Sequence, residues 1–429
     1  CRGANVQYSS GSGWTNIATN RTSSGRYHFD VYDWSGTEKL VMASGDAGTN
    51  YAATWDGSTY LLLNGSVGSG TGTAPTKPLD VKEHKGHMFF LQGQELTFSA
   101  PFNENKFDPS DGAGVINLSD TGVGMKSYRD ILYIFCEKSI YRVSGSSIND
   151  FKLDPVTKNI GCVSGWSIQE AGGDIIFLAP DGLRNVTGTE RIDDVNINTI
   201  SKSIQQRIKN LVSITYQISS LVIRDKSQYR LWYVKSDIAE TQNQGILGAL
   251  KQGETGLVWE YADILGMKPS YAASGYLGKV EYFLHGGWDD GIIYRQEQGS
   301  TFNGAAIDAR FRTPDYSFGD IGVRKMVKRV ALNLVFEGSV SPDLGMDYDY
   351  GSSAVPQPAV ISIATPTWVG IYGTGVYGAA VYTSNAIASI RNWVVGSGFL
   401  VAFSLNENDT NNPFTIQGFQ IEVVPGGRR

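Results

Sequence analysis

The chain repeats one short pattern of hydrophobic and polar positions. A run of about four apolar residues is followed by a polar or glycine turn and then by a second apolar run that often contains Tyr or Phe. Such a pattern predicts a β-hairpin. It occurs six times, at residues 39–63, 87–99, 130–144, 174–188, 228–261 (with a long insert) and 280–295.

The spacing of these hairpins indicates a repeat architecture. Their start positions lie 43 to 54 residues apart, close to the period of β-propeller blades. A lone hairpin cannot bury both of its faces, so we expect about six blades that stack side by side. A nonrepetitive sandwich with evenly spaced strands is the alternative. Residues expected between neighbouring sheets are Phe89, Ile134, Ile176, Trp232 and Phe283.

One segment has a helical period instead. Apolar residues recur at Ile200, Ile204, Ile208 and Leu211, behind a Thr199 or Ser201 cap. This spacing predicts a helix over residues 200–212, inserted between blades and packed on the propeller. A helix that binds a partner is the alternative.

The pattern changes after Gly299. From about residue 305 to the end, longer strands alternate apolar and polar residues, as in sheets with one buried face. The predicted fold is therefore all-β, with a β-propeller of about six blades, one inserted helix and a C-terminal β-sandwich-like domain. The expected domains are N-terminal strands at 1–38, the propeller at 39–300 and the sandwich at 301–429. Because Cys1 is not an initiating Met, we expect residues 1–38 to continue an upstream segment.

Composition agrees with short strands and tight turns. The chain has 51 glycines among 429 residues, 11% aromatic residues and 18% charged residues. A net charge of −6 lacks the broad basic character of proteins that grip phosphates, which argues against tight DNA binding. No run of about 18 apolar residues or signal peptide is visible, so no membrane span is expected. The three cysteines are far apart and odd in number, which predicts free, buried thiols.

Several motifs suggest chemistry but have simpler explanations. His84 and His87 would face opposite sides of a strand, and a turn at Gly86 explains both, so we predict no metal site. Asp289 and Asp290 read as turn residues. The GxGxxG match at residues 373–378 has no helix after it, so we predict no cofactor. GxSxG, HExxH, P-loop and CxxC motifs do not occur, and the chain is predicted not to be an enzyme.

A glycine-rich and aromatic segment at residues 367–384 is the first candidate for contacts with a partner. It would present Trp368, Tyr372 and Tyr377 on a long loop or hairpin, and aromatic residues suit protein interfaces. An ordinary packed hairpin is the alternative.

A basic cluster is the second candidate. Arg324, Lys325, Lys328 and Arg329 lie among apolar residues that break strict alternation, which predicts a bulge or bend. The cluster is interpreted either as a solvated strand edge protected by charge or as a contact with an acidic neighbour in a ring.

Four segments resemble a known family. They are DIIFLAPDGLRNVTG (174–188), GGWDDGIIYRQEQGSTFNG (286–304), FRTPDYSFGDIGVRKMVKRVALNL (311–334) and FTIQGFQIEVVPGGRR (414–429). They look like those of the tail nozzle or tail stabilisation proteins of short-tailed (podovirus) bacteriophages. The resemblance extends over most of the chain from about residue 40.

The resemblance implies a structural virion protein in the phage tail. Its members would form a homohexameric ring at the distal end, below the tail adaptor protein, as a conduit for genome ejection and a seat for tail fibres or a needle. Double-stranded DNA would pass without specific binding, which suits a negative chain because acidic groups repel phosphates.

Two alternatives from other classes remain. A receptor-binding or glycan-binding tail module would carry exposed Trp and Tyr in a concave site. A propeller glycosidase would carry paired carboxylates. The only sign of the latter is one approximate Asp-box turn at Ser44, Asp46, Gly48 and Tyr51.

Overall fold

The computed structural model forms two compact units, Cys1–Gln296 and Glu297–Arg429, here called the first and second unit. It describes residues 3–21, 25–45, 51–65, 72–187, 199–235, 244–253, 256–288, 290–336, 340–363, 369–370, 381–382, 386–410 and 413–428.

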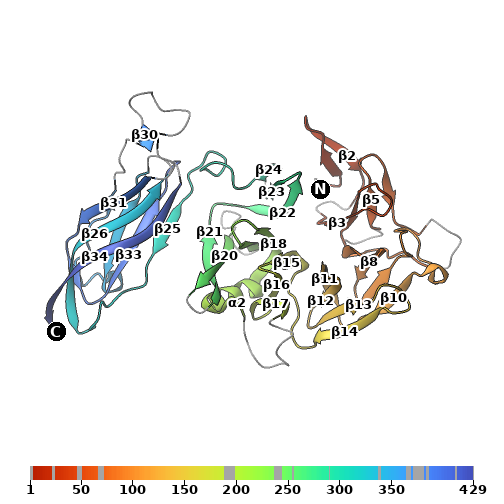
Figure 1. The fold of residues 1–429 in the computed structure, drawn as a ribbon, viewed down its shortest axis with the longest axis horizontal. Coiled ribbons are helices and arrows are strands. Elements are labelled where there is room, and N and C mark those ends of the chain that lie inside the picture. The colour runs from red at the N-terminus through yellow and green to blue at the C-terminus, as the bar shows by residue number, and fades with distance from the viewer. Residues whose placement is uncertain are drawn as a thin grey trace. The chain divides into compact units, whose positions relative to one another are not determined.

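The first unit consists of six consecutive antiparallel sheets after an N-terminal hairpin (Figure 1). The hairpin pairs β1 (Val6–Ser9) with β2 (Trp14–Ala18). Sheet one contains β3 (His28–Tyr32), β4 (Lys39–Ala43), β5 (Ala53–Trp55) and β6 (Tyr60–Leu62). Sheet two contains β7 (Asp80–His84), β8 (His87–Gln92), β9 (Glu95–Phe98) and β10 (Gly114–Asn117).

The remaining four sheets follow in chain order. Sheet three contains β11 (Gly122–Tyr128), β12 (Ile131–Cys136), β13 (Ile140–Ser144) and β14 (Lys152–Thr157). Sheet four contains β15 (Gln169–Ala171), β16 (Asp174–Ala179) and β17 (Gly182–Asn185). Sheet five contains β18 (Thr215–Ile223), β19 (Gln228–Lys235), β20 (Gln244–Gly253) and β21 (Gly256–Ile264). Sheet six contains β22 (Pro269–Leu277), β23 (Val280–Gly287) and β24 (Ile293–Arg295).

Apolar side chains fill the space between successive sheets. Phe89 of sheet two packs with Ile134 of sheet three, and Phe135 on the other face of sheet three lies 5.2 Å, centroid to centroid, from Phe177 of sheet four. Each fully buried side chain of this size contributes about 1.5–3 kcal/mol. The residues predicted to lie between sheets are indeed buried. The predicted propeller of about six blades is confirmed by this sheet order.

Each predicted hairpin lacks at least the first strand of its sheet. Sheet one, for example, begins at β3, which pairs with β4, so it starts at His28 and not at residue 39. The N-terminal hairpin covers sheet one, since Val6 and Ile17 pack with Met42. The strands at 1–38 are therefore shared between a covering hairpin and the first sheet.

The inserted helix is present as predicted. The 3₁₀ turn η3 (Lys202–Ile204) leads into α2 (Gln205–Ile214), between β17 and β18. Ile208 and Leu211 are buried in the apolar cluster of sheets four and five, so the helix packs on the propeller. Ser201 does not cap the helix with its side chain; its hydroxyl oxygen accepts a hydrogen bond from the Leu183 amide at 3.0 Å.

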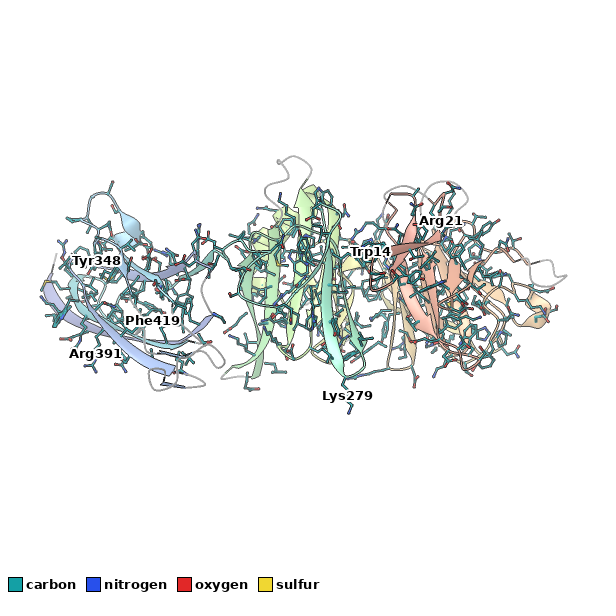
Figure 2. All side chains as sticks on the ribbon, turned by 90° about the horizontal axis from the view of Figure 1, so that it is seen from above. Trp14, Arg21, Lys279, Tyr348, Arg391 and Phe419 are labelled. Carbon is teal, nitrogen blue, oxygen red and sulfur yellow. The ribbon has the colours of Figure 1, made fainter. Side chains whose placement is uncertain are left out.

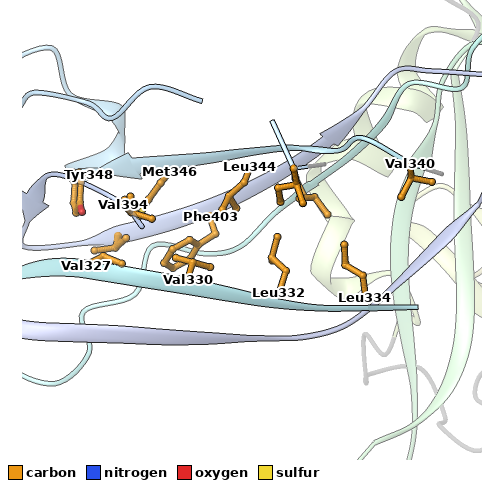
Figure 3. Close-up of a cluster of buried hydrophobic side chains, with 13 residues drawn as sticks. Val327, Val330, Leu332, Leu334, Val340, Leu344, Met346, Tyr348, Val394 and Phe403 are labelled. Carbon is orange, nitrogen blue, oxygen red and sulfur yellow. The ribbon is translucent and has the colours of Figure 1, made fainter. Parts of the chain in front are cut away.

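The second unit is a β-sandwich. One sheet has the order β25 (Ala309–Arg312), β33 (Val401–Glu407), β27 (Asp343–Tyr348) and β28 (Ile361–Ser362). In the other, β26 (Val323–Phe336) pairs with β31 (Ala386–Trp393), β32 (Ser397–Gly398) and β34 (Phe414–Arg428). Val330 and Leu332 of β26 pack against Leu344 and Phe403 of the facing sheet (Figure 3). This packing confirms the predicted C-terminal β-sandwich.

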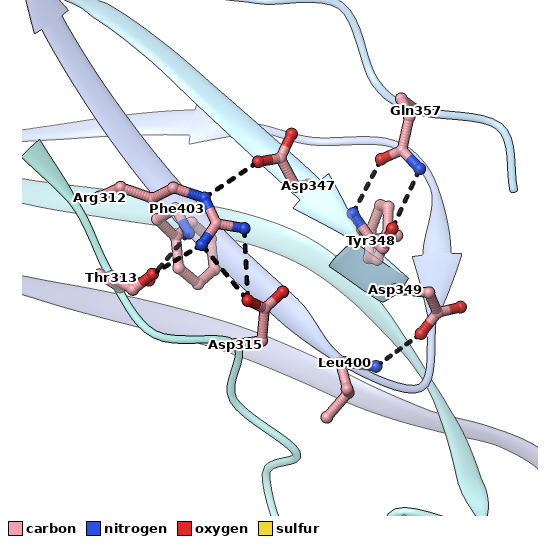
Figure 4. Close-up of polar contacts among 9 residues, drawn as sticks. All are labelled: Arg312, Thr313, Asp315, Asp347, Tyr348, Asp349, Gln357, Leu400 and Phe403. Atoms are coloured by element: carbon pink, nitrogen blue, oxygen red, sulfur yellow. Dashed lines mark hydrogen bonds and ion pairs between the residues drawn. The ribbon is translucent and has the colours of Figure 1, made fainter. Parts of the chain in front are cut away.

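Polar contacts fix the connection after β27 (Figure 4). The Gln357 amide accepts from the Tyr348 N–H at 2.8 Å and donates to the Tyr348 carbonyl at 3.0 Å. A carboxylate oxygen of Asp349 accepts from the Leu400 amide at 2.9 Å. Other short elements are η1 (Pro109–Asp111), η2 (Gly165–Ser167), η5 (Asp349–Gly351) and the parallel pair of β29 (Val369–Gly370) and β30 (Val381–Tyr382).

Cys136 and Cys162 are free and buried, as predicted, whereas Cys1 lies outside the described residues. Burial raises the pKa of each thiol to about 12. None of the helices in the described part of the chain has the length and apolar character that a bilayer-spanning helix needs.

Candidate functional site

The basic cluster lies on β26, which is bulged as predicted. Its register with β34 shifts between Val323 and Lys325 and again between Val327 and Arg329. β26 is not an edge strand, because it pairs with β34 along its length and with β31 and β32 as well. The interpretation as a charge-protected edge is therefore wrong.

The bulges send the four cations in different directions. Lys325 is buried, and its ammonium donates to the carbonyls of Asp320 and Phe399. It holds neighbouring backbone segments together and does not reach the surface. Arg324 and Lys328 are exposed on the other side of the strand.

Arg329 is the centre of a row across three strands. Its cross-strand neighbours are Trp393 on β31 and Glu422 on β34. The guanidinium lies 3.0 Å from a Glu422 carboxylate oxygen and 5.8 Å from the centre of the Trp393 ring. The ion pair is partly exposed and contributes little stability by itself.

Trp393 is the feature that distinguishes this face. Its side chain is 73% exposed although it lies on a regular strand. Arg391, two residues earlier, is also exposed, and Figure 2 shows it on the opposite side of the sandwich from the core residue Tyr348. We call the face formed by Arg324, Lys328, Arg329, Arg391 and Trp393 the Trp393 surface.

The chemistry of the Trp393 surface suits a protein contact. Trp and Arg are the residue types that most often dominate binding energy at interfaces. An exposed indole next to several cations favours a partner with an apolar pocket and acidic groups around it.

A second exposed surface lies on the first unit, at sheet six. Soluble proteins usually expose large apolar residues singly, whereas Tyr276, Leu277 and Val280 are exposed together at the turn between β22 and β23. We call these three residues the sheet-six surface. The exposed Ile292 and Ile293 lie at the other end of β23, opposite Gly286 and Gly287.

The structure does not test the aromatic candidates. Trp368, Tyr372 and Tyr377 lie outside the described residues, as do Gly373, Gly375 and Gly378 of the GxGxxG match.

Sequence reasoning missed Trp393 and Arg391. The signal was available, because the two residues share the outward positions of an alternating strand opposite Ile390. Alternation alone, however, does not reveal which face of a strand is covered.

The expectation that His84 and His87 face opposite sides of a strand is wrong. His84 and His87 are cross-strand partners in the β7–β8 hairpin, so they share a face, and both rings lie close to Phe89. Their Nδ1 atoms contact the Ser127 hydroxyl at 3.2 Å and the Ser99 carbonyl at 2.7 Å. Within the described ranges, no group of three or more His, Cys, Asp and Glu side chains is arranged to hold a metal ion.

Asp290 is a turn residue, as predicted. Its carboxylate accepts hydrogen bonds from the Ile292 amide at 2.9 Å and the Tyr294 hydroxyl at 2.5 Å. Asp289 lies outside the described residues.

Comparison with known proteins adds weak similarity only. No family model and no curated protein sequence matches the chain. Among solved structures, the N-terminal domain of Nup159 aligns with 63% of this chain and 74% of its own at 10% identity and a TM-score of 0.36. The AfRom2 CNH domain aligns with 63% of this chain and 96% of its own at 7% identity and a TM-score of 0.31. Sucrose-6-phosphate hydrolase from Lactobacillus gasseri aligns with 90% of this chain and 91% of its own at 10% identity and a TM-score of 0.22.

Proposed function

We propose that this chain is a structural subunit of a short-tailed bacteriophage tail, assembled as a homohexameric ring at the distal end. The family resemblance of its sequence suggests the tail. The observation that carries a role in assembly is the Trp393 surface, because a 73% exposed indole beside several arginines combines residue types that often dominate the binding energy of protein interfaces.

A ring needs two different surfaces on each subunit. In a closed ring with head-to-tail contacts, one patch of a subunit meets a different patch of the next. The Trp393 surface and the sheet-six surface supply two such patches of different character. In a chain of net charge −6, cations concentrated on one face also favour contact with the more acidic remainder of a neighbouring copy.

The same charge suits a passive conduit. Acidic groups repel phosphates, so double-stranded DNA would move past such a subunit without being held. The tail adaptor protein on one side, and tail fibres or a needle on the other, are the further partners that this position in the tail would require.

Electron microscopy tests the proposal directly. We expect purified protein at high concentration to form rings with sixfold symmetry, and antibodies against the chain to label the tips of phage tails. Protein that remains monomeric at high concentration and never labels tail tips would contradict the proposal.

A substrate screen separates the proposal from the other function classes. We expect incubation with bacterial surface polysaccharide to release no sugar, and no glycan to be retained. Release of sugar would identify a glycosidase, and retention without release would identify a glycan-binding module. Either result would reject a purely structural role.

A further inference from the structure

The first strands of the six sheets meet at the centre of the propeller and enclose a cavity of about 130 Å³. We call it the axial cavity. It is lined by residues of β3, β7, β11, η2, β15, β18 and β22, so every sheet contributes. Cross-contacts fix this centre: the Arg26 guanidinium donates to the Ile218 carbonyl at 2.6 Å, and Trp166 meets Tyr271 edge to face at 5.3 Å.

Two lysines line the axial cavity. The Lys82 ammonium donates one hydrogen bond, to the Phe29 carbonyl at 2.9 Å, and retains two further protons. Among the described residues, the ammonium of Lys126 makes no hydrogen bond and no ion pair. Burial lowers the pKa of Lys126, and the neighbouring charge of Lys82 lowers it further. Lys126 is half-buried, and an ammonium partly withdrawn from water gains from an anion that approaches it.

The nearby carboxylates do not neutralise these lysines by contact. Asp30 and Glu170 attract Lys126 from a distance, but a carboxylate oxygen of Asp30 accepts from the Glu83 amide at 2.8 Å. Asp80 accepts from the amides of Met125 at 2.7 Å and Val81 at 2.8 Å. Neither lysine therefore has a carboxylate in direct contact in the described structure, and each keeps ammonium protons for a ligand in the cavity.

His28 adds an unused polar atom. Its ring stacks on Trp166 at 3.7 Å, and its Nδ1 lies 3.5 Å from a carboxylate oxygen of Asp80. Its Nε2 is buried and has no hydrogen-bond partner in the described structure. On β18, the Ser219 hydroxyl oxygen accepts from the Ala272 amide at 2.7 Å, which leaves its proton available to a ligand.

We propose that the axial cavity binds a small tetrahedral oxyanion of the phosphate class, held by the ammonium groups of Lys126 and Lys82 and by the Ser219 hydroxyl. Charge-assisted hydrogen bonds of this kind are the strong ones in proteins. A tetrahedral anion presents oxygens in several directions, which matches donors that arrive from β7, β11 and β18. The inference goes beyond the proposed ring, since the cavity lies within a single chain.

Thermal unfolding with inorganic phosphate tests the site. We expect phosphate, compared with sodium chloride at equal ionic strength, to raise the Tm by about 3 °C or more once its concentration exceeds the Kd tenfold. Sulfate should act in the same direction, and acetate, which is planar, should act more weakly.

Lys126→Met is the decisive variant, and Lys279→Met is its matched control. Lys279 is exposed at the far end of the β22–β23 hairpin (Figure 2). Without phosphate, Lys126→Met should unfold at the same temperature as the parent protein or higher, because it removes a half-buried charge that has no ion-pair partner in the described structure. Its response to phosphate should disappear, and calorimetry should detect no binding. Lys279→Met should keep the rise of the Tm with phosphate and the binding that calorimetry detects.

Three results would overturn the proposal. One is a parent protein whose Tm responds equally to phosphate and chloride. Another is a Lys126→Met variant that keeps the full phosphate response. The third is a Lys126→Met variant that unfolds at lower temperature without phosphate, since Lys126 would then serve as a structural partner of Asp30 and Glu170.

Discussion

The guanidinium of Arg329 and the exposed indole of Trp393 lie 5.8 Å apart on adjacent strands of the second unit. Their proximity places a large apolar ring and a positive charge at one point of the surface, a combination common where binding energy is concentrated.

Trp393→Ala should weaken self-association about 30-fold, which corresponds to about 2 kcal/mol. The unfolding free energy of the monomer should change by less than about 0.5 kcal/mol, because the side chain is exposed. Sedimentation velocity over a concentration series measures the first quantity and urea unfolding the second. Tyr350→Ala, at a side chain that is 75% exposed in the same unit, is the control and should assemble normally. Unchanged assembly of Trp393→Ala would remove this residue from the interface.

Gly161→Ala should destabilise the propeller by about 2 kcal/mol or more. A β-carbon at Gly161 would lie 2.0 Å from the Glu137 carbonyl oxygen, so the backbone between sheets three and four would have to move. Gly275→Ala is the matched control, because nothing lies within 4 Å of the added carbon. Urea unfolding of both variants measures the difference. Equal stability of the two would show that the Gly161 segment adjusts freely.

Acid should destabilise the first unit through His84. Burial lowers the pKa of His84 to about 4, from 6.5 in the unfolded chain. Between these values the unfolded state binds a proton that the folded state does not, so stability falls as the pH drops from about 6.5 to about 4. The full shift corresponds to about 3 kcal/mol. Unfolding free energies measured across this range should show a smaller loss in His84→Asn. An identical slope in the variant would assign the acid sensitivity to other groups.

The thiols of Cys136 and Cys162 should resist alkylation in the folded protein. Burial holds the pKa of each near 12, so almost no thiolate exists at pH 8. Peptide mass spectrometry after iodoacetamide treatment should find both cysteines unmodified in the native state and fully modified in urea. Rapid native labelling of either would indicate local opening of sheet three or of the segment after it.

The sequence predicted the central hairpin of each sheet but not the first strand. Hairpins such as β12–β13 are visible because residues like Ile134 and Phe135 are buried on both faces. The first strand of each sheet faces the centre of the propeller, where polar and small residues lie. β15, for example, reads Gln-Glu-Ala, which carries no apolar period.

The sequence also did not show where the side chains of the candidate sites lie, because their positions depend on contacts between distant strands. A basic run in one strand was visible in the sequence, but the bulges that bury Lys325 and expose Lys328 depend on the pairing with β34. Lys82 and Lys126 come from different sheets, and no local pattern indicates that they share a cavity.

The pairing of β26 with β34 also determines when the second unit can form. Each propeller sheet joins strands that are neighbours in sequence, so it can form as soon as its own segment leaves the ribosome. β26, in contrast, receives β34 only when Phe414–Arg428 has been synthesised. Glu422, the ion-pair partner of Arg329, is therefore synthesised long after Arg329 itself. A chain that stops before β34 can carry a folded propeller, but it lacks one strand of the sheet that carries the Trp393 surface. If that surface joins subunits as we propose, such incomplete chains would be excluded from the assembly.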